Sequence, residues 1–339
     1  MPVRILGIET SCDETAAAVV EDGVRILSNV VSRQHALHER FGGVVPEIAS
    51  RAHIEAMLPV LDQALQGAGV RLREVDAVAV TTTPGLIGAL LIGVTAAKAL
   101  SWSLEVPLLA VDHLHAHIYA VWLAGATPGL PAISLVASGG HTSLFLSRGP
   151  LAHEFLGGTV DDAAGEAFDK VANILRLGYP GGPAIERVAA TGNPAAVAFP
   201  RSLLEPEGAA FSFSGVKTAV LYHCLGCNVS RGDIEKAHYD AQFVADVAAS
   251  FQEAVVDVLV AKVCATARKH NVSTILVGGG VAANARLRER LSAEAAGHGL
   301  AVHLAPASLC TDNAAMTAGI GYHLLQQGRE VRLTVEAEP

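Results

Sequence analysis

Hydrophobic residues near the N-terminus occur in short runs separated by polar turns, a pattern typical of buried strands. The run at residues 4–9 predicts a strand, and the polar turn 10–14 separates it from two further strands at 15–20 and 23–31. Beyond this hairpin, apolar residues take helical spacing over 46–66 and 86–100. Short apolar runs at 75–80 and 106–111 predict one strand before the second helix and one after it.

The second half of the chain repeats this order. It has a predicted strand at 132–137, a tight turn at 138–142 and strands at 143–147 and 153–156. Helices are expected over 161–175 and about 240–270, and a strand at 274–277 leads into three glycines. A strand hairpin followed by alternating helices and strands, given twice, predicts an α/β fold of two ribonuclease-H-like subdomains facing one cleft.

Composition agrees with a compact protein of two domains, because the 339 residues are 51% hydrophobic and only 17% charged. The apolar stretch 86–100 is too short for a membrane span and carries Lys98, and no basic N-terminal segment precedes a cleavage site. Five scattered cysteines argue against a disulfide framework and favour a cytoplasmic protein. The pair Cys224 and Cys227 is a weak indication of zinc or redox chemistry.

The formal charge of −9 argues against a simple nucleic-acid binder, since phosphate contacts need lysine and arginine. A polyanion would have to meet a local basic patch or the surface of a partner. Two such patches exist, and both are equally consistent with solvated faces. They comprise Arg33, His35, His38, Arg40, Arg51 and His53 in the first third, and Arg286, Arg288 and Arg290 later.

Two histidines, His113 and His117, open a predicted helix directly after the strand at 106–111, with Asp112 as its N-cap. One helical turn places both imidazoles on one face, where they can converge on a metal ion or an anion, while His115 falls on the other side. Ordinary packing is the commoner outcome of this spacing. The distant polar cluster 310–313 adds a carboxylate, Asp312, and two imidazoles with one carboxylate are the donors of an open, catalytic metal site.

Glycine-rich turns stand at equivalent points of the duplicated plan. Residues 138–140 allow close approach of the backbone to an anion, and Thr10 and Ser11 place hydroxyls beside the acids Glu9, Asp13 and Glu14. The glycines at 278–280 precede the helix that carries Asn284. Each turn alone predicts only a tight bend, but together they favour a nucleotide cleft.

Eight segments, in one order from the first strand to the last helix, resemble the tRNA threonylcarbamoyladenosine transferase family, the TsaD type once labelled a sialoglycoprotein endopeptidase. His141, where archaeal and eukaryotic relatives tend to have asparagine, makes the chain similar to the bacterial branch. The segments are GIETSCDET (7–15), VPEIASRAH (45–53), ASGGHT (137–142), GEAFDK (165–170), YPGGP (179–183), FSFSGVKT (211–218), GGGVAAN (278–284) and CTDNAAM (310–316).

The resemblance implies an actin-like ATPase (ASKHA) fold with a central cleft. Its first subdomain would cover residues 1–130, completed by a C-terminal helix at 311–328, and its second would cover 131–310. It also implies transfer of a threonylcarbamoyl group from threonylcarbamoyl-adenylate to the exocyclic amine of the adenosine beside the anticodon. The tRNAs concerned read codons that begin with A.

Carried over position by position, the resemblance assigns one divalent metal ion, iron or zinc, to His113, His117 and Asp312. An adenine nucleotide or threonylcarbamoyl-adenylate would occupy the cleft. Asp13 or Glu14 is expected to orient the amine or accept its proton, and a solvated or cation-binding role is an equal alternative. The implied substrate-binding positions are Val136 and Ala137 through their backbone, with Ser138, Gly139, Gly140, Asp169, Gly182, Glu186 and Asn284.

The implied partners are tRNA, a scaffold paralogue of the TsaB type, an ATPase of the TsaE type and the enzyme that supplies threonylcarbamoyl-adenylate. Two departures stand out: His115 replaces a frequent glutamate, and Ala137 replaces a common valine. A metalloprotease would need glutamate at Leu114, and a non-catalytic scaffold would lack the metal-ligand set. An actin-like sugar or acetate kinase would share the fold without these ligands.

Overall fold

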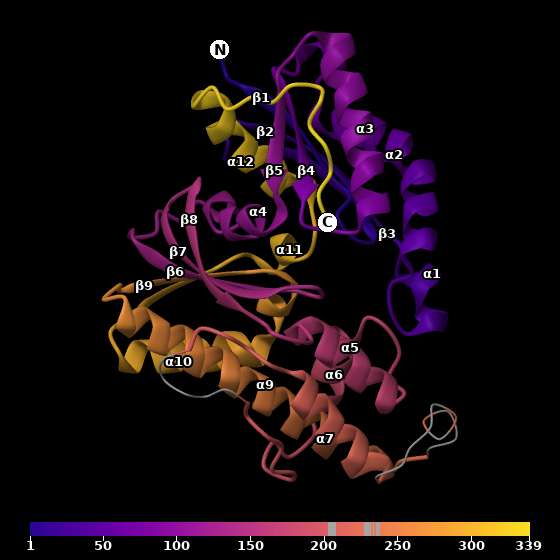
Figure 1. The fold of residues 1–339 in the computed structure, drawn as a ribbon, viewed down its shortest axis with the longest axis vertical. Coiled ribbons are helices and arrows are strands. Elements are labelled where there is room, and N and C mark those ends of the chain that lie inside the picture. The colour runs from indigo at the N-terminus through magenta and orange to yellow at the C-terminus, as the bar shows by residue number, and fades with distance from the viewer. Residues whose placement is uncertain (203–207, 227–231, 233, 235–237) are drawn as a thin grey trace. The chain divides into compact units, whose positions relative to one another are not determined.

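The computed structural model describes residues 1–202, 208–226, 232, 234 and 238–339, and the chain divides into two compact units (Figure 1). Unit 1 comprises residues 1–127, 148–153 and 305–339. Unit 2 comprises residues 128–147 and 154–304. The chain therefore enters unit 2 and returns to unit 1 for its last helix.

Unit 1 is built on a five-stranded sheet in the order β3-β2-β1-β4-β5. β1 pairs antiparallel with β2 and parallel with β4, and β4 pairs parallel with β5. All eight residues of β2 are buried, which explains its run of alanine and valine without alternation. The predicted strands are confirmed with small shifts of their ends: β1 Arg4–Glu9, β2 Glu14–Glu21, β3 Arg25–Arg33, β4 Ala77–Thr83 and β5 Leu108–Asp112.

Helices cover both faces of this sheet. α2 (Pro46–Ala68) and α3 (Ile87–Leu104) lie on one side, and α12 (Ala314–Gln326) lies on the other (Figure 1). α12 approaches β1 closely because Gly7 has no side chain: a Cβ there would stand 2.3 Å from the carbonyl oxygen of Ala314. Shorter elements of unit 1 are α1 His35–His38, α4 His113–Tyr119, α11 Ala307–Cys310 and 3-10 turns at Glu39–Phe41, Leu72–Glu74 and Trp122–Ala124.

The helix α3 is longer than its sequence pattern predicts. With 18 residues it is the one described helix that is long and apolar enough to cross a membrane. The expectation that this apolar stretch is too short for a membrane span is therefore wrong. α3 nevertheless packs against β4, β1 and α2, and its buried residues include Leu90, Val94 and Ala97. One face of α3 thus packs against the sheet and α2, although only 33% of the helix is buried.

Unit 2 repeats the sheet of unit 1, with the order β8-β7-β6-β9-β10. β6 pairs antiparallel with β7 and parallel with β9, and β9 pairs parallel with β10. The predicted duplication is therefore confirmed. β10 lacks a sequence signal because it is short and its residues are exposed or half-buried. The strands are β6 Ala132–Ala137, β7 Thr142–Gly149, β8 Ala152–Gly158, β9 Thr274–Gly278 and β10 Ala301–Leu304.

The helix α9 (Ala241–Lys269) is the central helix of unit 2 and contacts α6, α7, α10 and the sheet. Asp240 caps it by accepting a hydrogen bond from the Phe243 amide at 2.8 Å, as its predicted start at 240 requires. α5 begins three residues later than predicted, since Asp161 instead accepts a hydrogen bond from the Phe213 amide. The other helices are α5 Ala164–Ile174, α6 Gly181–Ala189, α7 Ser214–Leu225, α10 Ala285–Gly297 and a 3-10 turn at Gly280–Ala283.

Candidate functional site

The first two ligand candidates are placed by the start of α4. The Asp112 side chain accepts hydrogen bonds from the amides of Leu114 at 2.8 Å and His115 at 3.0 Å, as an N-cap does. The helix therefore begins at His113, and His117 follows one turn later on the same face. The predicted cap and the predicted pairing of the two histidines are both confirmed.

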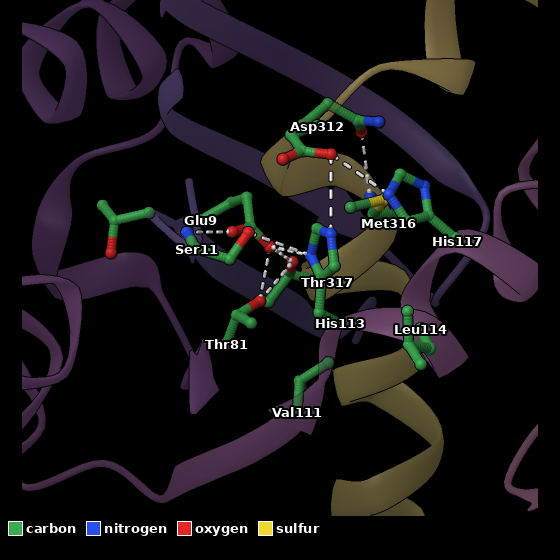
Figure 2. Close-up of polar contacts among 12 residues, drawn as sticks. Glu9, Ser11, Thr81, Val111, His113, Leu114, His117, Asp312, Met316 and Thr317 are labelled. Atoms are coloured by element: carbon green, nitrogen blue, oxygen red, sulfur yellow. Dashed lines mark hydrogen bonds and ion pairs between the residues drawn. The ribbon is translucent and has the colours of Figure 1, made fainter. Parts of the chain in front are cut away.

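Asp312, just before α12, lies against both imidazoles (Figure 2). Its Oδ1 is 3.1 Å from His117 Nε2 and 3.6 Å from His113 Nε2. The two rings lie edge to face with centroids 4.5 Å apart. Both histidines are buried, and the ligand atoms of the three residues lie within 4.8 Å of one another. The structure thus brings together three side chains that are distant in sequence.

These distances fit one metal ion. Bonds of about 2.0–2.1 Å to nitrogen and oxygen in a tetrahedral site place neighbouring ligand atoms roughly 3.3 Å apart. The observed separations of 3.1 and 3.6 Å lie on either side of that value. Three protein ligands leave a position for substrate or water, which is typical of a catalytic metal site. The cluster is compatible with a single metal centre.

Behind His113 lies a buried carboxylate, Glu9, at the end of β1. Glu9 Oε2 is 3.2 Å from His113 Nδ1, on the side of the ring away from Asp312 (Figure 2). Thr81 donates to the same oxygen at 2.6 Å, and the Ser11 amide donates to Oε1 at 2.6 Å. A carboxylate that receives the Nδ1 proton fixes the imidazole so that the bare Nε2 faces the metal position.

The charges of this group explain its protonation. Burial by itself would lower the pKa of His113, but the Asp312 and Glu9 carboxylates outweigh it and raise the pKa to about 9. Burial and the neighbouring His113 charge lower the pKa of His117. Without a metal ion, one proton on His113 therefore balances part of the buried negative charge, and a divalent cation would replace that proton.

His115 does not belong to this group. Its ring lies against that of His153, with centroids 4.6 Å apart. The ligand cluster found among the described residues consists of His113, His117 and Asp312. The prediction that His115 falls on the other side of α4 is confirmed.

Asp13 and Glu14 lie in and after the turn between β1 and β2. Both are buried, with 5% and 7% of their surfaces exposed, and Asp13 Oδ2 has no hydrogen-bond partner among the described residues. Burial raises the pKa of Glu14 well above its usual value, and the charges of Asp312 and Asp13 add to that effect. The nearest basic group is His35, whose Nε2 is 3.6 Å from Glu14 Oε1.

In unit 2 the positions that the resemblance assigns to substrate binding lie where neighbouring helices and strands contact one another. The Gly165 amide of α5 donates to the Ser138 carbonyl at 3.1 Å, and Asp169 on the same helix accepts from the Gly181 amide at 2.7 Å. Glu186 on α6 accepts from the Ala285 amide at 2.7 Å, at the start of α10. Asn284 caps α10 by accepting from the Leu287 amide at 3.0 Å, and Gly279 packs against Ala137 at the end of β6.

Comparison with known proteins decides the family. The family model described as tRNA N6-adenosine threonylcarbamoyltransferase (TsaD) matches residues 25–319. The curated protein of that name from Anaeromyxobacter dehalogenans (strain 2CP-C) is 50% identical over 337 residues, covering 99% of this chain and 98% of its own length. The protein of the same name from Syntrophobacter fumaroxidans is 53% identical, covering 94% of this chain and 93% of its own. The chain belongs to this transferase family.

The solved structures confirm the fold. The crystal structure of component A of the Acidaminococcus fermentans (R)-2-hydroxyglutaryl-CoA dehydratase matches with a TM-score of 0.54 at 14% identity. The match covers 95% of this chain and 98% of that one. At this identity the likeness concerns the fold alone, which is the actin-like ATPase fold expected from the sequence.

The glycines of unit 2 divide into two kinds. A Cβ at Gly139, Gly140, Gly182 or Gly280 would have no heavy atom within 4 Å, so these positions border open space. Gly279 is different, because its φ is +94° and a Cβ there would stand 2.4 Å from the carbonyl oxygen of Ala137. The run Gly278–Gly280 was expected to face a ligand as a whole, but Gly279 is required by packing.

Most residues of the two predicted basic patches are buried or already paired within the protein. His38 and His53 are fully buried, so neither can meet phosphate at the surface. In the later patch, Arg286 and Arg290 both pair with Glu253, and Arg288 donates to the Ala282 carbonyl at 2.7 Å. The arginines of that patch form local structural contacts. Cys227 lies outside the described residues, and the described cysteines, Cys12, Cys224, Cys264 and Cys310, form no disulfide with one another.

Sequence reasoning missed the role of Glu9 and of His53. Glu9 was grouped with the other acids of the first turn, and His53 with a surface patch. The signal for Glu9 was its place at the end of β1, which pairs in parallel with β4. β4 carries Thr81 and pairs in parallel with β5, which ends at Asp112 next to the predicted histidines. His53 lies on the face of α2 that also buries Ala49, Met57 and Val60, and this spacing indicates the core.

Proposed function

We propose that this chain transfers the threonylcarbamoyl group of threonylcarbamoyl-adenylate to N6 of the adenosine beside the anticodon in tRNAs that read codons beginning with A, in the cytoplasm. Membership of the family at about half identity over nearly the whole chain carries the proposal. The amine attacks the activated carbonyl, a carbon–nitrogen bond forms, the bond to the phosphate oxygen breaks, and AMP leaves. The adenylate is already activated, so the protein needs no covalent intermediate.

We assign the metal to His113, His117 and Asp312, with iron favoured over zinc. Bound there, the cation would act as a Lewis acid for a carboxylate or phosphate of the donor. The fit rests on the ligand distances and on the buried Glu9, whose Oε2 lies 3.2 Å from His113 Nδ1. Glu9 holds the His113 ring so that Nε2 is free to bind.

Unit 2 would bind the adenylate. The open glycines Gly139, Gly140 and Gly182 allow a phosphate or base to lie against the backbone, where a side chain would block it. Asp169 and Glu186 each use one carboxylate oxygen to hold a helix N-terminus, and we assign both side chains to a ribose or threonyl hydroxyl of the donor. The Asn284 Oδ1 caps α10 and its Nδ2 donates to Gln252 Oε1 at 2.8 Å, so Asn284 would contribute the second N–H of its amide.

Asp13 and Glu14 would handle the proton that the attacking amine loses. A carboxylate with a raised pKa is a stronger base than an ordinary one, and burial raises the pKa of Glu14. The buried, unpartnered Oδ2 of Asp13 would accept a hydrogen bond from the amine. We therefore assign proton acceptance to Glu14 and orientation of the amine to Asp13.

The decisive experiment is reconstitution. The full-length chain is combined with its partner proteins, synthetic threonylcarbamoyl-adenylate and a tRNA transcript whose anticodon reads a codon beginning with A. Nucleoside mass spectrometry should show threonylcarbamoyladenosine, and His117→Gln should abolish both product and bound metal. His115→Ala is the matched control, because His115 lies on the same helix outside the ligand set. Product formed at full rate by His117→Gln would refute the assigned metal centre.

We propose further that tRNA binding needs partner proteins, because a chain with a net charge of −9 repels the phosphates of tRNA. These partners are a scaffold paralogue, an ATPase and the enzyme that supplies threonylcarbamoyl-adenylate. Arg51 on α2 shares its exposed face with Ile54 and Leu58, which are 61% and 75% exposed. Arg40 is also exposed. A basic residue continuing into exposed apolar ones favours a protein interface over a tRNA contact.

Charge reversal separates these two roles. Arg40→Glu with Arg51→Glu should prevent assembly with the scaffold paralogue while leaving metal content unchanged. If assembly survives and tRNA binding by the complex weakens with a smaller salt dependence, this face contacts tRNA instead.

A further inference from the structure

The imidazole of His53 connects α2 to the turn that carries the two acids. His53 is fully buried. Its Nε2 is 3.0 Å from the Cys12 carbonyl oxygen, and its Nδ1 is 2.7 Å from Thr15 Oγ1. Cys12 and Thr15 are the residues that flank the dipeptide Asp13–Glu14, so one ring holds both ends of it.

The chemistry of the partners fixes the tautomer. A carbonyl oxygen only accepts hydrogen bonds, so Nε2 carries the proton and donates it to Cys12. Nδ1 is then bare and accepts the hydroxyl proton of Thr15. Burial lowers the pKa of His53, which keeps the ring in this neutral form. Both bonds are therefore directional and both are protected from water.

Other contacts hold the turn as well, and on its C-terminal side Glu14 pairs with Arg33 between β2 and β3. Thr10 donates to the Ala89 carbonyl at 2.9 Å, and the Ser11 carbonyl accepts from the Leu86 amide at 2.8 Å. Among the described residues, His53 is the side chain with a hydrogen bond on each side of the acids. It therefore contacts the chain on both sides of the two carboxylates.

We propose that His53 is a positioning residue that holds Asp13 and Glu14 in place for proton transfer, with Thr15 as its partner. This inference rests on the role proposed above for the two acids. A displacement of about 1 Å at a reacting group costs on the order of a hundredfold in rate. Loss of one of the two bonds should therefore lower kcat roughly ten- to a hundredfold, with KM for tRNA nearly unchanged.

The test is a double-mutant cycle in the assembled complex, measured as single-turnover transfer from threonylcarbamoyl-adenylate to the tRNA transcript. Thr15→Val removes the hydroxyl with little change of shape. His53→Asn keeps an acceptor near the Nδ1 position for Thr15, but the shorter side chain places no donor at the Nε2 position that faces Cys12. Thr15→Ser, which retains the hydroxyl, is the matched control and should transfer within about twofold of the unsubstituted rate. Metal content and melting temperature verify that each variant folds.

Each substitution is then repeated in the Glu14→Gln background. A residue that acts through Glu14 should cost less than about twofold there, because the group it positions is already gone. Equal losses in both backgrounds would show a merely structural role and overturn the inference.

Two further outcomes separate the inference from the proposed function. If Asp13→Asn and Glu14→Gln both transfer at the unsubstituted rate, the acid role fails and the inference falls with it. If those two variants lose transfer while Thr15→Val and His53→Asn keep it, the acid role stands and the positioning role alone is overturned.

Discussion

Replacing Glu9 by glutamine tests how the protein selects the tautomer of His113. The two oxygens of Glu9 have different partners: Oε1 accepts from the Ser11 amide, and Oε2 accepts from Thr81 and faces His113 Nδ1. Glutamine has one oxygen and one NH2 group. An NH2 group at the Oε1 position would face the Ser11 N–H, donor against donor. The amide nitrogen must therefore take the Oε2 position.

At the Oε2 position the amide donates a hydrogen bond to His113 Nδ1, and the Thr81 hydroxyl can turn to accept another. Nδ1 is then the bare nitrogen, and the proton moves to Nε2, where it blocks metal binding. Loss of such a carboxylate partner weakens metal binding by roughly ten- to a hundredfold. This corresponds to about 1.4–2.8 kcal/mol, since every tenfold is 1.4 kcal/mol.

The assay is competition with a chelator of known affinity, followed by elemental analysis of the protein. Glu9→Gln should require roughly ten- to a hundredfold more free metal for half-occupancy than the unsubstituted chain. Thr317→Val is the control, because Thr317 touches the same oxygen only at 3.5 Å and carries no charge. Its affinity should stay within about threefold.

Equal affinities for Glu9→Gln and the unsubstituted chain would refute the reasoning. Glu9 would then have no part in preparing His113, and its burial would need another explanation. Circular dichroism spectra must match for the comparison to count.

Four further outcomes follow from the structure. Gly280→Val should weaken binding of an adenylate analogue in calorimetry and keep a native circular dichroism spectrum, since nothing lies within 4 Å of its Cβ position. Gly279→Val should instead unfold at lower temperature, because its Cβ would collide with the Ala137 carbonyl, and an unchanged melting temperature would contradict this. Apparent metal affinity should fall about tenfold per pH unit from pH 9 to 7, because the pKa of His113 is raised to about 9 and the metal must displace that proton; a flat profile in chelator titrations would exclude it. His115→Ala should keep full metal content by elemental analysis, and loss of metal would place His115 in the site.

Much of the fold was predictable because its signals are local. Most strands of both sheets are short apolar runs with turn residues at their ends. The helix α9 has an aspartate cap and a long stretch of apolar residues at helical spacing. Two departures from the prediction have physical causes. β10 is short and exposed or half-buried, and α5 loses its expected start because Asp161 bonds to the Phe213 amide, far along the chain.

The site was predictable only in part, for the same reason. Spacing pairs His113 with His117, since one helical turn separates them, but only the fold brings Asp312 to them. The roles of Glu9 and His53 depend on contacts across 104 and 38 residues of sequence. The difference between Gly279 and Gly280 depends on what faces each Cβ position, which no spacing rule contains.

The return of the chain to unit 1 has a consequence for the order of synthesis. α12 covers one face of the first sheet and follows Asp312, so the first sheet leaves the ribosome long before its own covering helix exists. The ligand set needs residues 113 and 312 together. A chain interrupted anywhere in unit 2 would therefore lack both the third ligand and the helix that closes the sheet. Metal retention by the nascent protein would mark synthesis through α12, and interrupted chains would remain metal-free with an exposed apolar sheet that quality control can recognise.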